Sequence, residues 1–268
     1  MLELTIVKVF HEGLSEARRI EPYVKQCDVY SPENAACTEA ESRGYENLVQ
    51  ALYSLSLSAF RKEAGKLVKS QSPEQRNYTL KLNEFLFKAK KPVYCLERFS
   101  LTESFYLRSK KNSEENILDE FSNMLKRGDV DSGLHAFWAF ICLGAEVTRF
   151  RDQHMAKTLE NAEAEIRARY ASLRTKEPLR LTLGIGGLHS PEMFIDTKVC
   201  KPTIIYMDEY AANHSITRLT RAVYEGKTNF EESQHELLAA YLLTNNKITA
   251  EEAANKSCEE LKEIIIRQ

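Results

Sequence analysis

The sequence lacks the features that define several large classes of protein. Its 268 residues contain no run of about 18 apolar residues, so no transmembrane helix is expected. The first residues, MLELT, lack the basic start and the long apolar stretch of a signal peptide. The 37 basic and 39 acidic side chains nearly balance, so no overall field favours nucleic acid or an anionic membrane as a partner.

Cysteine pairs and common catalytic motifs are missing as well. The six cysteines lie far apart and form no Cys-x-x-Cys pair, which argues against a zinc site of cysteines and against a disulfide scaffold. We therefore expect free thiols in a reducing cytoplasm. There is no Walker loop and no G-x-S-x-G elbow. The segment GIGGLH is not a dinucleotide fingerprint, because its sixth position is His189 and Pro191 follows where a long helix would start.

The most informative stretch present is residues 179–190, LRLTLGIGGLHS. Apolar and other residues alternate over a length typical of a strand. Gly186 and Gly187 then allow a tight turn or a close approach of the backbone to another group. His189 would lie at the C-terminal end of the strand, where open α/β sheets bind their ligands. A buried strand followed by a loop histidine without a function is the alternative.

A similar order of elements occurs near the N-terminus. Residues 3–33 and residues 180–209 each give a strand, a turn with a histidine, a short helix, and a second strand that ends in carboxylates. This repetition predicts an α/β fold whose central sheet is built from two related β-α-β halves. The alternative is that two unrelated β-α-β units look alike.

Helical sequence fills most of the rest of the chain. Residues 39–89 are predicted to be helical, with a break and restart at Ser72-Pro73. Residues of about 103–175 form a large helical insertion. We therefore expect an α/β domain at 1–210 and a helical C-terminal extension, 211–268, packed on it. Thr249 and Glu252 form a capping box within that extension.

Polar residues gather where the predicted strands end. Two histidines and a carboxylate from separate strands can hold a divalent metal with open positions, and such a metal can make a hydroxide from bound water. We therefore predict that His11 and His189 lie within about 10 Å of each other. A nearby arginine could bind a substrate carboxylate or stabilise an oxyanion. Each acidic residue taken alone could equally be part of a solvated loop. The strand-end residues are His11, Glu12, Glu33, Glu97, Arg98, His189, Asp208 and Glu209.

Four segments give the chain a family resemblance. They are TIVKVFHEGLSEARRIEPYVKQCDVY, KPVYCLERFSLTESFYLRS, FRDQHMAKTL and LTLGIGGLHSPEM, in that order over roughly residues 4–210. Together they resemble the TraB/Tiki family, within the wider group of erythromycin-esterase-like and ChaN-like proteins. The resemblance implies two β-α-β halves with an inserted helical region. In Tiki proteins, Gly-x-x-His motifs and an acidic residue are associated with metal-dependent peptidase activity.

The resemblance also implies roles for particular residues. His11, His189 and Glu33 would hold manganese, cobalt or zinc, with Glu12 as an alternative carboxylate. Gly186 and Gly187 belong to the Gly-x-x-His motif. The residues implied to take part in catalysis are Glu33, Glu97, Arg98 and Arg151.

Two functions follow from these observations. The first is a metal-dependent hydrolase, peptidase-like, and it is favoured by the presence of both histidines and both arginines. The second is a non-catalytic protein that binds a peptide or small molecule in a degenerate site. Lys8 favours the second, because it stands where the first Gly-x-x-His motif should have glycine. A homo-oligomer is compatible with either function.

Overall fold

The structure is a computed structural model that describes every residue except 10–13, 34–36, 70, 208–214, 246 and 268. The chain divides into two compact units. Unit 1 comprises Met1–Ser104 and Arg151–Ala211, and unit 2 comprises Phe105–Phe150 and Ala212–Gln268. The middle of the predicted helical insertion thus belongs to the same compact unit as the C-terminal helices, and the predicted domains 1–210 and 211–268 stay a prediction.

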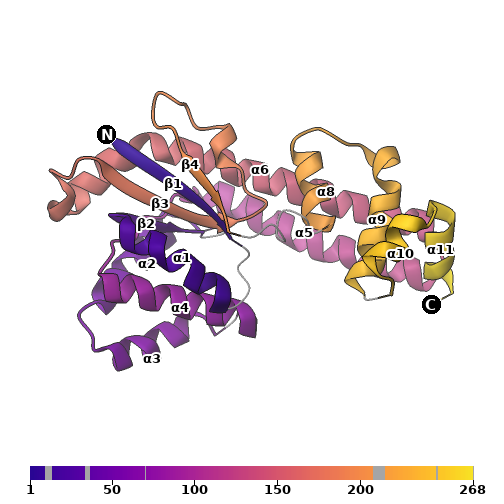
Figure 1. Cartoon of the computed structure of the whole chain (residues 1–268), viewed down its shortest axis with the longest axis horizontal. Helices are drawn as coiled ribbons and strands as arrows, with labels where there is room; N and C mark the ends of the chain where they lie inside the picture. Colours follow the sequence, from indigo (N-terminus) through magenta and orange to yellow (C-terminus); the bar gives the residue numbers. More distant parts are fainter. Residues whose placement is uncertain (10–13, 34–36, 70, 208–214, 246, 268) are drawn as a thin grey trace. The chain divides into compact units, whose positions relative to one another are not determined.

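Unit 1 contains a four-stranded parallel sheet, which confirms the α/β class (Figure 1). Its strand order is β2-β3-β1-β4. The strands are β1 (Leu2–Val9), β2 (Val29–Pro32), β3 (Leu179–Gly186) and β4 (Thr203–Tyr206).

The two predicted β-α-β units interleave in this sheet. The strand β3 lies between β1 and β2, and β1 lies between β3 and β4. If β1 is exchanged with β3 and β2 with β4, the strand order becomes β4-β1-β3-β2. This is the observed order read from the opposite edge of the sheet. Their connections differ, because helix α1 (Leu14–Gln26) has 13 residues whereas the second connection contains only the short 3-10 helix η2 (Pro191–Met193). The shared origin of the two halves stays a prediction.

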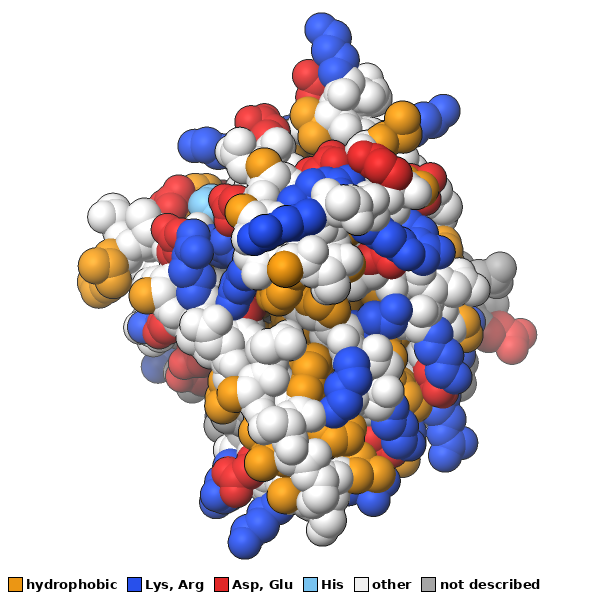
Figure 2. Space-filling view, turned by 90° about the vertical axis from the view of Figure 1, so that its left-hand side faces the viewer, with side chains coloured by type: hydrophobic (Ala, Val, Ile, Leu, Met, Phe, Trp, Pro, Cys, Tyr) orange, Lys and Arg blue, Asp and Glu red, His pale blue; other side chains and the backbone are white. Residues whose placement is uncertain are grey.

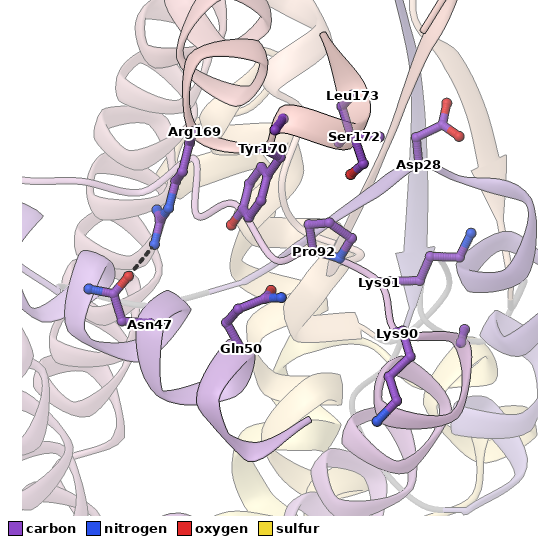
Figure 3. Close-up of a pocket in the computed structure, with 12 residues that line it drawn as sticks. Asp28, Asn47, Gln50, Lys90, Lys91, Pro92, Arg169, Tyr170, Ser172 and Leu173 are labelled. Carbon is purple, nitrogen blue, oxygen red and sulfur yellow. Dashed lines mark hydrogen bonds between the residues drawn. The ribbon is translucent and has the colours of Figure 1, made fainter. Parts of the chain in front are cut away.

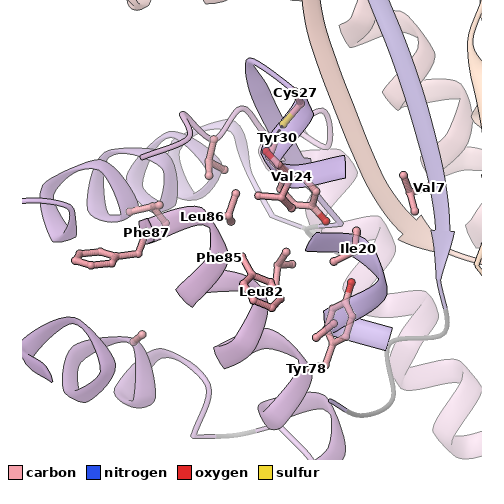
Figure 4. Packing of buried hydrophobic residues seen from close by; sticks show 14 of the residues in the cluster. Val7, Ile20, Val24, Cys27, Tyr30, Tyr78, Leu82, Phe85, Leu86 and Phe87 are labelled. Atoms are coloured by element: carbon pink, nitrogen blue, oxygen red, sulfur yellow. Dashed lines mark hydrogen bonds between the residues drawn. The ribbon is translucent and has the colours of Figure 1, made fainter. Parts of the chain in front are cut away.

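The strands β1, β2 and β3 are mostly buried on both faces, as expected for parallel strands, whereas the edge strand β4 is largely exposed. Side chains alternate along β1, so that Val7 and Val9 join one apolar cluster while Leu4 and Ile6 join another. The first cluster contains residues of α1 and α4 (Pro73–Ala89), and Figure 4 shows Val7 near Ile20. The second cluster contains residues of the long helix α6 (Val130–Arg169).

Gly184 of β3 makes room for an aromatic side chain in the first cluster. A Cβ at this position would lie 2.0 Å from the hydroxyl of Tyr30. Tyr30 is fully buried (Figure 4), so its ring could not move aside. Packing against Tyr30 therefore explains why this position is a glycine, because the strand has no unusual backbone angle here.

The helices of unit 1 begin where the sequence supplies capping residues. The predicted break at Ser72-Pro73 is confirmed, because the Ser72 hydroxyl accepts from the N–H of Gln75 and Pro73 is the first residue of α4. The segment Val93–Phe99 forms two isolated bridges: Val93 pairs with Tyr30 of β2, and Phe99 pairs with Thr38, which caps α2 (Glu39–Leu52). The other helices of unit 1 are α2 (Glu39–Leu52), α3 (Leu57–Leu67) and α4 (Pro73–Ala89), followed by the short η1 (Ala171–Leu173).

Unit 2 is helical and has its own apolar core, which includes Phe121, Phe137 and Leu237. The predicted capping box of Thr249 and Glu252 is confirmed at the start of α10. Among the described residues, no helix is both long enough and apolar enough to cross a bilayer. Helices α5 (Leu101–Lys126) and α6 (Val130–Arg169) contribute to both units. Unit 2 also contains α8 (Ser215–Tyr224), α9 (Phe230–Thr244), α10 (Ala250–Asn255) and α11 (Cys258–Ile266).

Candidate functional site

Two predicted site residues meet where the C-terminal ends of the parallel strands lie, which we call the carboxyl edge of the sheet. Glu33 follows the last residue of β2, and its backbone N–H donates to the carbonyl of Gly184. The Gly186-Gly187 turn after β3 closes when the N–H of His189 donates to the carbonyl of Gly186. The N–H of Gly186 in turn donates to Oε2 of Glu33 at 2.8 Å. Adjacent parallel strands thus bring Glu33 and His189 together.

The imidazole of His189 lies between two carboxylates. Its Nδ1 is 2.6 Å from Oδ1 of Asp152, and its Nε2 is 3.2 Å from Oε1 of Glu33. His189 and Asp152 are both buried. The second oxygen of Asp152 accepts from the N–H of Ser190 at 2.6 Å. Asp152 therefore fixes both the ring and the backbone that follows it.

Arg151 extends this arrangement on the other side of Glu33. Its Nε and Nη2 donate to the two oxygens of Glu97 at 2.6 and 3.1 Å. Nη2 also donates to Oε1 of Glu33 at 2.8 Å. The result is a row of alternating charge that we call the carboxyl-edge chain: Asp152, His189, Glu33, Arg151 and Glu97.

The neighbours of His189 determine its charge. Burial and the positive charge of Arg151 lower the pKa of the imidazole, but the charge of Glu33 and the hydrogen bonds to Asp152 and Glu33 raise it. The net effect raises the pKa of His189 from 6.5 to about 9. Glu97 and Glu33 likewise raise the pKa of Arg151. The raised pKa favours the imidazolium at neutral pH, and in this form both ring nitrogens carry N–H groups that can donate.

Arg98 lies outside the carboxyl-edge chain, although it follows Glu97 in sequence. Successive side chains of an extended segment point to opposite sides, so Glu97 faces Arg151 whereas Arg98 faces α2 and α6. The guanidinium of Arg98 donates to Glu46 at 2.8 Å and to Glu165 at 2.7 Å. Of the two predicted arginines, only Arg151 contacts Glu33, the carboxylate that also contacts His189.

Lys8 is buried next to the carboxyl-edge chain. Its ammonium donates to the hydroxyl of Ser190 at 3.2 Å and to Glu192 at 2.5 Å. Only 1% of its side chain is exposed, so the charge does not reach solvent. Lys8 therefore adds a positive charge close to His189.

Sequence analysis missed Asp152, and it named residues that the structure does not describe. Asp152 stands directly after Arg151 in the FRDQHMAKTL segment, and its position beside an expected site arginine was the available signal. His11, Glu12, Asp208 and Glu209 lie outside the described residues. The predicted approach of His11 to His189 therefore stays a prediction.

The described residues do not fit a metal ion as they are arranged. Among them, no group of three or more His, Cys, Asp or Glu side chains is placed to hold one. Glu33 and His189 could supply two donors, but Nε2 of His189 and Oε1 of Glu33 are hydrogen-bonded to each other at 3.2 Å. Nη2 of Arg151 also donates to Oε1 of Glu33, the same oxygen that faces His189.

The chain matches no protein-family model, no curated protein and no solved structure. The resemblance to the TraB/Tiki family therefore stays a prediction, and the chemistry of the site rests on its own geometry.

Proposed function

We propose that unit 1 binds a peptide or a small polar molecule at the carboxyl edge of its sheet, without a divalent metal. The observation that supports this proposal is the position of the buried His189 ring between the carboxylates of Asp152 and Glu33, which raise its pKa and favour the imidazolium. A protonated histidine donates hydrogen bonds and cannot act as a metal ligand through those nitrogens. Such a site recognises its ligand by charge and hydrogen bonding.

The partly exposed side chains of the carboxyl-edge chain are the ones that a ligand would contact. The side chains of Arg151 and Glu33 are 12% and 19% exposed, whereas that of Glu97 is 1% exposed. The planar fork of Arg151 suits a ligand carboxylate or carbonyl. Glu33 can accept from an ammonium or an amide N–H. A peptide offers both a carboxylate or carbonyl for Arg151 and an ammonium or amide N–H for Glu33. The buried members of the carboxyl-edge chain keep Arg151 and Glu33 in position.

A peptide with free ends is the direct probe of this proposal. We expect a tripeptide with free termini to shift the NMR signals of the Arg151 Nε–H and the His189 ring, because it competes for their carboxylate partners. Arg151→Lys and Glu33→Gln should each weaken binding about tenfold, which corresponds to one charged hydrogen bond. The matched control is Arg61→Lys, which alters a partly buried pair with Glu84 elsewhere in unit 1 and should leave affinity unchanged. Equal losses in all three variants, or no shift in the wild type, would contradict the proposal.

A metal-dependent hydrolase is the second candidate, and one observation favours it. Metal-binding histidines usually direct their other ring nitrogen to a carboxylate, as His189 does to Asp152. Glu33 and His189 would then hold the ion, which would supply an activated water. Arg151 would orient a substrate carboxylate or an oxyanion.

Melting curves with manganese, cobalt or zinc separate the two candidates. If a metal must displace the Nε2 proton of His189, its apparent affinity should rise about tenfold per pH unit until the pH approaches 9. A hundredfold excess over the dissociation constant would stabilise unit 1 by about 2.7 kcal/mol. Under our proposal none of the three metals shifts the melt at neutral pH, where His189 keeps its Nε2 proton. A pH-dependent shift that His189→Gln abolishes and His235→Gln retains would favour the hydrolase.

A further inference from the structure

Tyr206 lies at the carboxyl edge, on the same face of the sheet as Glu33. It is the last residue of β4, and its partner in the parallel register is Lys8 of β1. Lys8 points to the same face as Ile6, two residues earlier, and Ile6 belongs to the apolar cluster that contains residues of α6. Glu33 contacts Arg151 of α6. Both side chains therefore lie on the face of the sheet that α6 covers.

Apolar side chains are exposed around this end of β4. Tyr206 is about half exposed, and Ile204 is exposed on the same face because it lies two residues earlier in the strand. Met193 is also about half exposed, and it follows Glu192, which contacts the same Lys8 ammonium as the Tyr206 ring. We call Met193, Ile204 and Tyr206 the β4 apolar patch.

The charges beside this patch are neutralised within the protein. The Lys8 ammonium lies 5.1 Å from the centre of the Tyr206 ring and donates to Ser190 and Glu192. Its side chain is buried, so the patch presents apolar surface rather than charge. One edge of the sheet therefore offers two kinds of surface: a charged one at Arg151 and Glu33, and an apolar one at β4.

The spacing of the strands sets the distance between these two surfaces. β2 and β4 are the outer strands of the sheet, with β3 and β1 between them. Neighbouring strands lie about 4.8 Å apart, so the ends of β2 and β4 are about 14 Å apart. An extended peptide advances about 3.5 Å per residue, so about four residues cover this distance.

We propose that the carboxyl edge takes a short peptide with an apolar side chain at the fourth residue from its free carboxylate. The carboxylate lies at Arg151, and the apolar side chain packs on the β4 apolar patch. This inference rests on the proposed function, because Arg151 and Glu33 hold the same peptide. Charge fixes one end of the peptide, and burial of apolar surface against the Tyr206 ring selects the residue at the other.

A hollow at the opposite end of the strands provides a reference surface. It has a volume of about 650 Å³ and lies beside Asp28, which directly precedes β2 (Figures 2 and 3). Figure 2 shows lysine and arginine side chains beside apolar ones on this face. Lys90 and Lys91 each donate to a backbone carbonyl, and in Figure 3 their side chains point in different directions. Arg169 is paired with the buried Glu46, so the cations of this hollow already have partners.

Acetylated tetrapeptides test the position of the apolar residue, with the NMR signal of the Arg151 Nε–H as the readout. We expect acetyl-Phe-Gly-Gly-Gly to bind about tenfold more tightly than acetyl-tetraglycine, because its ring buries apolar surface on the patch. In acetyl-Gly-Gly-Phe-Gly the ring is only two residues from the carboxylate and does not reach the patch. Its gain over acetyl-tetraglycine should be less than about twofold.

Variants of the patch should remove the gain from phenylalanine. Tyr206→Ala should abolish it, and Tyr206→Phe should retain it because the ring makes the contact. Ile204→Thr keeps a residue suited to a strand and should reduce the gain, so the test does not depend on the folding of Tyr206→Ala. Leu55→Ala is the matched control, since it removes an exposed apolar side chain of unit 1 outside the patch. Gln50→Ala alters the hollow beside Asp28, and both changes should leave the gain unaltered.

The failure of this inference differs from the failure of the proposed function. If acetyl-tetraglycine binds and Arg151→Lys weakens it, but phenylalanine gives no gain or equal gains at both positions, only the inference is wrong. If no peptide shifts the signal, the proposed function is wrong and the inference fails with it. A loss of the gain in Gln50→Ala would place the peptide at the other end of the strands. A dimer in sedimentation that Tyr206→Ala dissociates would show that a second copy covers the patch, and it would also overturn the inference.

Discussion

Replacing Asp152 with alanine is expected to destabilise unit 1 by about 3–5 kcal/mol, because it leaves a buried charge without its partner. The Asp152 side chain is fully buried, and its two oxygens accept from His189 and from the N–H of Ser190. Removing both acceptors leaves the imidazolium with only Glu33 and leaves one buried N–H without its acceptor. The same change should lower the pKa of His189.

Hydrogen exchange of the backbone amides in β1 and β3 measures this loss, since these strands form the centre of the sheet. Fluorescence of Trp138, the single tryptophan, is unsuitable because that residue belongs to unit 2. Asp196→Ala is the matched control: this aspartate of unit 1 is exposed, and its carboxylate accepts from the N–H of Lys198 at 2.8 Å. It should cost about 1 kcal/mol or less. Similar losses for Asp152→Ala and Asp196→Ala would refute the role given to Asp152.

The second large effect is expected at Glu46. This residue is the buried centre of a group that we call the Arg98 cluster: Glu46, Arg98, Glu165 and Arg169. Oε1 of Glu46 accepts from the N–H of Cys95 at 2.6 Å and from Arg98 at 2.8 Å, and Oε2 accepts from Arg169. Glu46→Ala would leave the guanidinium of Arg98 with fewer acceptors at a buried position. We expect unit 1 to lose about 3–5 kcal/mol, measured by the same exchange experiment.

Glu165→Ala provides the comparison for Glu46→Ala. Glu165 also accepts from Arg98, but its side chain is 42% exposed, so water can replace the lost partner. Its loss should cost about 1 kcal/mol or less. Because the Arg98 cluster is separate from the carboxyl-edge chain, Glu46→Ala should leave the pKa of His189 unchanged. A shift of that pKa would show that the two clusters are coupled.

The sequence predicted the parts of this site that depend on local pattern. Alternation of apolar residues located β3, and the parallel arrangement of strands then placed Glu33 and His189 at one edge. Asp152 could not be found in this way, because its role depends on the path of α6 beside the sheet. The different directions of Glu97 and Arg98 also required the structure, since both follow the same apolar run. The interleaved order of the strands is a long-range property that neither β-α-β unit encodes alone.

The charge of His189 has a consequence for stability. Its pKa is raised in the folded protein, so the stability it contributes is fully present below pH 6.5 and is lost as the pH rises through about 9. A shift of this size corresponds to about 3 kcal/mol. Removal of the proton would leave Glu33 and Asp152 facing a neutral ring, and it would open Nε2 to a metal.

The pKa of the His189 imidazole is therefore the most direct test of a metal-free, charged site. NMR titration of the ring signals would measure it, with His189→Gln used to assign them among the six histidines. We predict a pKa of about 9, with the ring protonated throughout the neutral range. A pKa at or below the ordinary value of 6.5 would contradict the proposed site, because a neutral His189 could not hold two carboxylates by two N–H groups and would be free to bind a metal.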